Sequence, residues 1–144
     1  MSSEWGARNF TAISALATKV STNFKDALDG YGYISEEVLS LQDLIDKVAY
    51  HFKTTPLGSN YRRDSQKILE SCQSVLEDLN SLIEKYKRLA STNKRLVFMS
   101  VKFGKEDIVS LQERLMTNAA VLKSLVRRFV PCFQHQSWIL MSLS

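Results

Sequence analysis

Two histidines and two cysteines are the side chains of this 144-residue chain best suited to metal binding or covalent chemistry. Neither His51 nor His135 belongs to a set of Cys and His residues large enough for a metal site, and neither follows a glutamate by three residues, as a helical di-iron site requires. Neither cysteine has an evident base partner, and the chain contains no Gly-x-Ser-x-Gly turn or glycine-rich phosphate loop. The sequence therefore predicts no catalytic, cofactor-binding or metal-binding residue, no small-molecule substrate and no enzymatic activity.

The cysteines also indicate a cellular compartment. Cys72 lies on an apolar helical stripe, which predicts a buried free thiol, and Cys132 lies far from it in the sequence. Two cysteines do not form a disulfide scaffold, so a reducing compartment fits best. We see no signal peptide and no run approaching the roughly 20 apolar residues of a membrane span. We therefore expect a cytoplasmic protein and leave its recruitment to the plasma membrane on activation open.

The N-terminal helix, expected over residues 8–28, is the first candidate contact surface. Its apolar face carries Phe10, Ile13, Ala17, Val20, Phe24 and Ala27, and its opposite face carries Thr11, Thr18, Ser21, Thr22, Lys25 and Asp29. Aromatic residues on an amphipathic helix are typical of a membrane interface. The same face would equally serve as a quarter of a bundle core, and both interpretations hold if the helix can be released. The membrane-contact candidates are Trp5, Phe10, Ile13, Val20 and Phe24.

A basic stretch is the second candidate surface, because no acidic residue lies between Lys85 and Lys105. Its basic members are Lys85, Lys87, Arg88, Lys94, Arg95, Lys102 and Lys105, which are interleaved with Leu96, Val97, Phe98, Met99, Val101 and Phe103. Such a surface suits anionic lipid head groups, at about 1 kcal/mol per basic residue. A solvated turn between helices is the simpler interpretation. Nucleic-acid binding is the least favoured, because no recognised nucleic-acid-binding signature accompanies the charge.

Charge and composition bound the class of protein. The formal net charge is +4, and the part up to Tyr50 is acidic, so the basic excess belongs to the remainder of the chain. Only five Gly and two Pro interrupt the chain, which favours helices throughout. Its length fits one domain with a single core. These features predict an all-α protein.

Apolar spacing places the helices that carry these surfaces. Ser35 is the expected N-cap of a second helix that runs to Phe52, and a third, long helix is expected from Arg62 to Ala90. A fourth should open at Lys105–Asp107 and end at Val130 before Pro131. Two stripes at steps of three and four face the core: Cys72, Val75, Leu79, Leu82, Tyr86 and Leu89, then Ile108, Leu111, Leu115, Ala119, Leu122, Val126 and Phe129.

The resulting fold is an all-α bundle of four helices, or five if the third breaks at 91–94. The bundle domain covers residues 1–131. The remainder, 132–144, is a short, uncharged and apolar tail, either docked or disordered.

Three segments resemble a known family. They are SCQSVLEDLNSLIEKYKRL at 71–89, KFGKEDIVSLQERLMTNAAVL at 102–122 and FKDALDGYGYISEEVLSLQDLI at 24–45. They are similar to the fungal N-terminal domain that precedes STAND receptors and ankyrin-repeat proteins, one of the HeLo-like helical bundles. Family members usually carry Trp before the fourth helix, where this chain has Phe98 and Phe103.

The resemblance implies a function. HeLo-like domains are proposed to self-associate, expose the N-terminal helix and disturb membranes. We therefore expect a non-enzymatic module of fungal immune-type or incompatibility signalling and cell death, with self-association, protein partners and an anionic membrane as its contacts. The alternative is a soluble protein–protein docking module without membrane activity, whose third and fourth helices offer a groove.

Overall fold

The computed structural model describes residues 7–27, 32–54, 59–92 and 108–128, and each of these stretches is an α-helix. Helix α1 spans Ala7–Ala27, α2 spans Gly32–Thr54, and α3, the longest at 34 residues, spans Ser59–Thr92. The fourth, here called the 108–128 helix, completes the bundle. Over these residues the predicted all-α bundle with a long third helix is confirmed.

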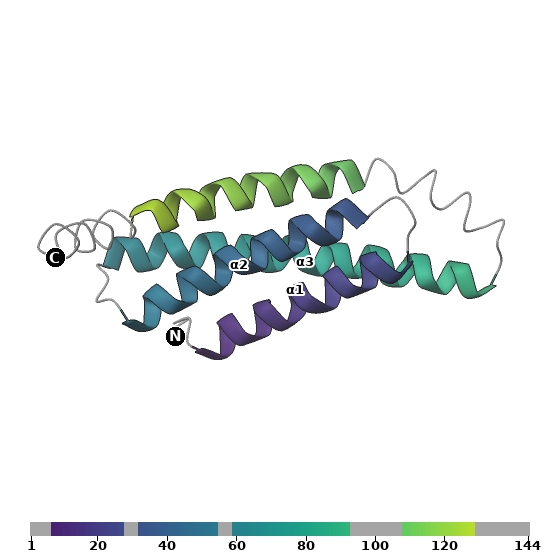
Figure 1. Ribbon diagram of the computed structural model, residues 1–144, viewed down its shortest axis with the longest axis horizontal. Coiled ribbons are helices and arrows are strands. Elements are labelled where there is room, and N and C mark those ends of the chain that lie inside the picture. The colour runs from purple at the N-terminus through teal and green to yellow at the C-terminus, as the bar shows by residue number, and fades with distance from the viewer. Residues whose placement is uncertain (1–6, 28–31, 55–58, 93–107, 129–144) are drawn as a thin grey trace, which may run out of the picture.

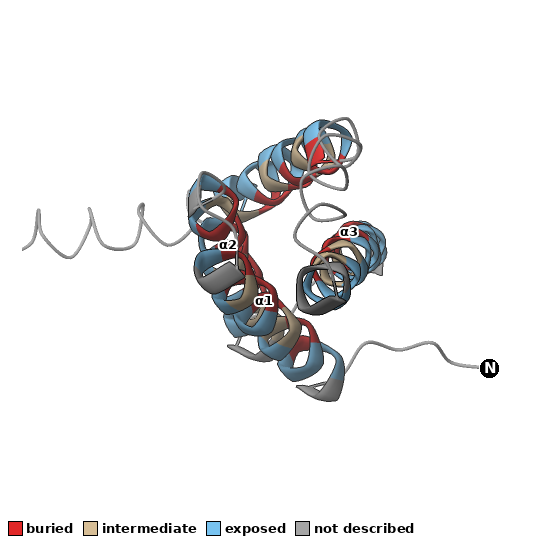
Figure 2. Ribbon diagram, turned by 90° about the vertical axis from the view of Figure 1, so that its right-hand side faces the viewer, coloured by how far each residue is buried: buried red, intermediate tan, exposed pale blue. Residues whose placement is uncertain are grey.

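The helices alternate in direction along the chain. In Figure 1, α1 and α3 run one way, and α2 and the 108–128 helix run the other. Seen end-on in Figure 2, α1 packs beside α2, whereas α2 and α3 occupy opposite corners. Polar contacts join the 108–128 helix to both α2 and α3, through Gln112 to Glu37 and through Arg114 to Asp78. Helix α1 therefore lies diagonally opposite the 108–128 helix, and its apolar face looks into the centre of the bundle.

Apolar stripes at helical spacing fill that centre. The largest fully buried side chains come from all four described helices: Ile13, Val20, Phe24, Ile34, Leu41, Ile45, Leu69, Leu76, Leu79, Ile83, Leu115 and Leu122. Burial of such a side chain contributes roughly 1.5–3 kcal/mol, so this core dominates the stability of the fold. The α3 stripe is wider than predicted, since Leu69, Leu76 and Ile83 are buried beside Cys72, Val75 and Leu79. A helix that contacts neighbours on two sides must bury a broad face.

Two predictions at the α1–α2 contact were wrong. Ser35 does not cap α2, because the helix already begins at Gly32 and Ser35 lies in its first turn, buried. Ser21, assigned to the polar face of α1, is also buried. The physical reason is the close packing of α1 along α2, which covers the edge of the polar face as well as the apolar stripe. Two small hydroxyl side chains fit there because each satisfies the other.

The remaining predicted boundaries vary in outcome. Helix α3 begins at Ser59 and ends at Thr92, slightly beyond the predicted Arg62 and Ala90, as is usual for helix ends. The predicted start of the fourth helix at Lys105 and its end at Val130 lie outside the described residues. So do Leu89's side chain, Phe129 and the 132–144 tail.

Candidate functional surfaces

The titratable side chains of the described residues do not gather into a reactive centre. No group of three or more His, Cys, Asp or Glu in this part of the chain could hold a metal ion. Cys72 is a free thiol, and its side chain is fully buried, as predicted. Burial raises the pKa of this thiol to about 12, so the nucleophilic thiolate is scarcely populated at neutral pH. His51 is half-buried at the end of α2, with its ring centroid 5.6 Å from that of Tyr50.

The membrane-contact candidates on α1 form part of the core. Phe10, Ile13, Val20 and Phe24 are all buried, and Trp5 lies outside the described residues. The Phe10 ring packs 5.3 Å from that of Phe52, over which the guanidinium of Arg62 lies at 5.4 Å. In this arrangement the apolar face of α1 is buried against the other helices, so it is not available to contact a bilayer. None of the described helices has the length and hydropathy needed to cross a membrane.

A line of polar contacts runs beside this apolar face, between α1 and α2. The hydroxyls of Ser21 and Ser35 lie 2.7 Å apart, and the Ser21 hydroxyl also donates to the Ser35 carbonyl at 3.2 Å. About two turns further along α2, the Gln42 amide nitrogen donates hydrogen bonds to Ser14 and Thr18 of α1. The shortest of these contacts, at 2.8 Å, is to the Thr18 hydroxyl. This line of polar contacts was not predicted from the sequence. The sequence feature that could have indicated it is the row of hydroxyl residues at 14, 18 and 21, which follows helical spacing along the apolar stripe.

The basic candidates are only partly described. Lys85, Lys87 and Arg88 are exposed near the C-terminal end of α3, whereas Lys94, Arg95, Lys102 and Lys105 lie outside the described residues. The Lys87 ammonium donates to the Asn23 side chain of α1 at 2.8 Å. Nearby, Lys19 of α1 pairs with Glu84 of α3 at 3.5 Å, with both side chains more than half exposed. Of the three described basic candidates, Lys87 therefore links α3 to α1.

The groove between α2 and the 108–128 helix is a surface that the sequence did not predict. It has a volume of about 460 Å³, and its lining residues are Tyr33, Glu36, Glu37, Ser40, Leu115, Met116, Ala119, Ala120 and Lys123. Tyr33 is 41% exposed and Met116 is 59% exposed, both high for large apolar side chains. We call it the α2 groove. The sequence feature that could have indicated this groove is Met116, an apolar residue next to Leu115 of the core stripe.

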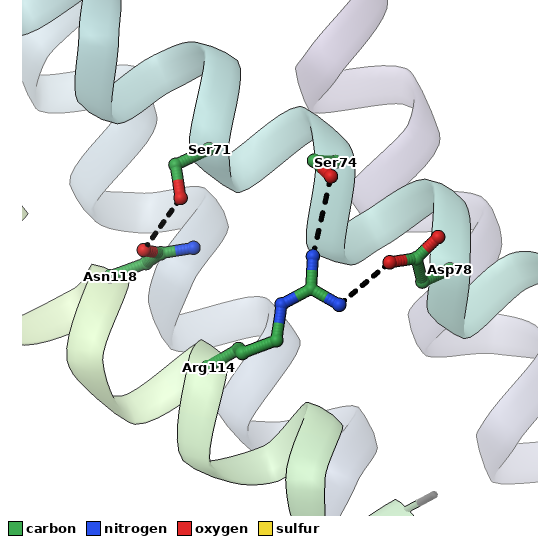
Figure 3. Close-up of polar contacts among 5 residues, drawn as sticks. All are labelled: Ser71, Ser74, Asp78, Arg114 and Asn118. Carbon is green, nitrogen blue, oxygen red and sulfur yellow. Dashed lines mark hydrogen bonds and ion pairs between the residues drawn. The ribbon is translucent and has the colours of Figure 1, made fainter.

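Polar groups also join α3 to the 108–128 helix (Figure 3). Arg114 reaches Asp78 at 2.6 Å and the Ser74 hydroxyl at 3.3 Å, and the Ser71 hydroxyl donates to the side-chain oxygen of Asn118 at 3.0 Å. Asn118 is buried, and its amide nitrogen has no hydrogen-bond partner. This interface therefore combines an exposed ion pair with a buried amide that is only half satisfied.

Further along the same interface, a shallower groove of about 350 Å³ is lined in part by Ile68, Val121 and Arg128. Beside it, the Tyr61 hydroxyl donates to the Leu125 carbonyl. Burial raises the pKa of Tyr61 to about 12, against the opposing effect of the Arg128 charge.

No family model, curated protein or solved structure matches this chain.

Proposed function

We propose that this chain is a non-enzymatic helical signalling module that acts through its first helix, in fungal immune-type or incompatibility signalling and cell death. At rest α1 is stored in the bundle. On self-association in the cytoplasm it is released, and its apolar face enters an anionic membrane such as the plasma membrane. The observation that carries the proposal is the burial of the apolar face of α1, an amphipathic helix whose core residues from Phe10 to Phe24 have the composition of an interfacial helix.

The energetics of α1 favour such a transfer. Its exposed links to α3, the Lys19–Glu84 pair and the Lys87–Asn23 hydrogen bond, are of a kind that contributes at most about 1 kcal/mol each. Most of the free energy that holds α1 therefore comes from apolar burial. A lipid interface restores apolar burial, whereas water does not. Release into a membrane then costs far less than release into solvent.

The charge at the end of α3 supports the choice of an anionic membrane. Lys85, Lys87 and Arg88 are exposed near the C-terminal end of α3, and Lys87 contacts Asn23 of α1. Each basic residue near an anionic surface contributes about 1 kcal/mol of attraction. Because Lys87 binds Asn23 of α1, a lipid phosphate that competes for its ammonium would also loosen this link. Attraction to the membrane and release of α1 would thus involve the same side chain.

A reversible lock on α1 tests the proposal. The side chains of Ser21 and Ser35 converge, so Ser21→Cys with Ser35→Cys should form a disulfide that holds α1 on α2. A Cys132→Ser background leaves the buried Cys72 as the sole natural cysteine of the sequence. We expect leakage of calcein from vesicles that contain phosphatidylserine only after reduction of this disulfide. Neutral vesicles should stay intact.

A matched lock elsewhere serves as the control. Ser71→Cys with Asn118→Cys joins α3 to the 108–128 helix and leaves α1 free, so this variant should cause leakage before and after reduction. Leakage by the oxidised α1 lock would contradict the proposal. So would intact vesicles with the folded wild-type protein at every concentration and lipid composition.

The second candidate function is a soluble docking module with no membrane activity. The specific observation in its favour is the α2 groove, where Tyr33 and Met116 remain exposed although α1 is fully docked. Folded protein that binds partner helices and never causes leakage would favour this alternative.

A further inference from the structure

We infer that the α2 groove is a docking site for an amphipathic helix of a partner protein, with aliphatic residues on one face and Lys or Arg beside them. The inference rests on the docking function proposed above as the second candidate, and it names the surface and the chemistry of the partner. It does not depend on the membrane function, because the groove lies away from α1.

The shape of the groove suits a helix. Its walls are α2 and the 108–128 helix, which run in the same direction, and the lining residues 33–40 and 115–123 cover about two turns of each, or roughly 12 Å. Leu115 forms the buried floor, and the small side chains of Ala119 and Ala120 let another backbone approach closely. A helix in such a groove inserts residues spaced by three and four positions.

Two exposed apolar side chains supply the contact area. Tyr33 on α2 and Met116 on the 108–128 helix both line the groove, and each exposes more than two-fifths of its surface. Tyrosine offers a large contact area with few rotatable bonds, and methionine adapts its shape to a partner side chain. An aliphatic anchor between them would remove both from water.

The charges of the α2 wall select a basic partner. Glu36 and Glu37 lie on this wall, and among the described residues neither takes part in an ion pair. One carboxylate oxygen of Glu37 accepts a hydrogen bond from Gln112 at 3.0 Å, whereas the other is buried without any hydrogen-bond partner. An unsatisfied buried carboxylate oxygen is costly, and a guanidinium or ammonium group is its strongest donor. Because Glu37 lines the groove, a basic side chain of a bound partner would lie near this carboxylate.

The opposite wall orients the partner. Lys123 is exposed on the 108–128 helix and lines the same groove, so the two walls carry opposite charge. A partner helix with basic residues on one flank and an acidic or neutral residue on the other fits in one orientation only. A second copy of this chain and a lipid surface are the other occupants that an experiment must separate.

Selection from a display library of helical peptides tests the inference, with the full chain as target. Selected peptides are synthesised with a fluorophore, and binding is measured by anisotropy. We expect Leu, Ile or Met at i and i+4, with Lys or Arg beside them. Affinity should fall about tenfold or more with Met116→Glu and several-fold with Glu36→Lys.

Matched controls on the 108–128 helix keep the result specific. Val121→Glu changes an exposed apolar residue of the other groove, and Glu113→Lys reverses an exposed charge outside the α2 groove. Both should leave peptide affinity unchanged. Circular dichroism and the urea midpoint establish that each variant folds, as expected for exposed positions.

Several results would overturn the inference. They are a failure to select any peptide, selected peptides without basic residues, and binding that survives Met116→Glu. Self-association lost in Met116→Glu by sedimentation would assign the groove to a second copy, and vesicle binding lost in the same variant would assign it to lipid. Vesicle leakage by Met116→Glu is measured in parallel, so failure of the groove and failure of the membrane function are distinguishable.

Discussion

Ser21 and Ser35 face each other across the α1–α2 contact with their hydroxyl oxygens 2.7 Å apart, both buried. The Ser21 hydroxyl has one proton and donates it to the Ser35 carbonyl, so the Ser35 hydroxyl must donate in the short contact. A shift of α1 by one turn would separate the pair and leave two buried hydroxyls unsatisfied. The pair therefore fixes the register of the helix that we propose is released.

A double-mutant cycle measures this coupling. Ser21→Ala should lower the free energy of unfolding by about 1–3 kcal/mol, because the Ser35 hydroxyl then stays buried without its partner. Ser21→Ala with Ser35→Ala should cost less than the sum of the single changes. Urea unfolding followed by circular dichroism gives the values. Thr22→Ala, at an exposed neighbouring position, is the control and should change stability by less than about 0.5 kcal/mol.

At Asn118, in contrast to Ser21, we expect that removal of the polar side chain does not lower the free energy of unfolding. Its amide nitrogen is buried without a partner, and its oxygen accepts from Ser71, an exposed residue whose hydroxyl can turn to water (Figure 3). Asn118→Leu removes the unsatisfied group, so the free energy of unfolding should stay constant or rise by about 1 kcal/mol. Urea unfolding measures the change, with the exposed Ser71→Ala as a near-neutral control. A loss above about 1 kcal/mol would mean that the Asn118 amide stabilises the core by more than its hydrogen bond with Ser71 explains.

Spacing alone predicted the helices and most of the core because burial in a bundle follows helical periodicity. Ile13, Val20 and Phe24 occupy the predicted face of α1, and Leu115 and Leu122 that of the 108–128 helix. The width of a buried face depends on how many neighbours a helix has, which spacing does not show. Leu69, Leu76 and Ile83 of α3 therefore fell outside the predicted stripe, and Ser21 was placed on the wrong face of α1.

The surfaces were harder to predict than the core. A groove arises where two helices distant in sequence lie side by side, as α2 and the 108–128 helix do, so Tyr33 and Met116 carry no shared signal in the chain. The buried oxygen of Glu37 likewise depends on Gln112, a residue of the other helix. Only a three-dimensional arrangement brings such pairs together.

The core role of α1 predicts a sharp contrast between two aromatic residues. Phe24 is fully buried, whereas Tyr50 of α2 is 57% exposed. Phe24→Ala should lower the free energy of unfolding by about 3–5 kcal/mol, because it removes apolar contacts and leaves a cavity. Tyr50→Ala should cost less than about 1 kcal/mol. Similar losses for both substitutions, measured by urea unfolding, would contradict the placement of α1 in the core.

Cys72 predicts how stability depends on alkaline pH. Burial raises the pKa of its thiol from 9.0 to about 12 in the folded protein. Below pH 9 both states keep the proton, so the thiol adds no pH dependence. Between pH 9 and about 12 the unfolded state binds fewer protons than the folded state, so the free energy of unfolding falls as pH rises. The loss from this thiol should reach roughly 2–3 kcal/mol by pH 11.

Comparison with Cys72→Ala isolates this contribution, because Tyr61, with its pKa raised from 10.0 to about 12, adds a loss of the same sign in both proteins. Urea unfolding at pH 7, 9, 10 and 11 in a Cys132→Ser background gives the two slopes. The wild-type thiol should produce the steeper decline, although Cys72→Ala lowers stability at neutral pH by leaving a small cavity. Parallel slopes would show that the thiol reaches solvent in the native state. In that case the thiol reagent DTNB should label Cys72 in the folded protein at neutral pH, whereas a closed core protects it.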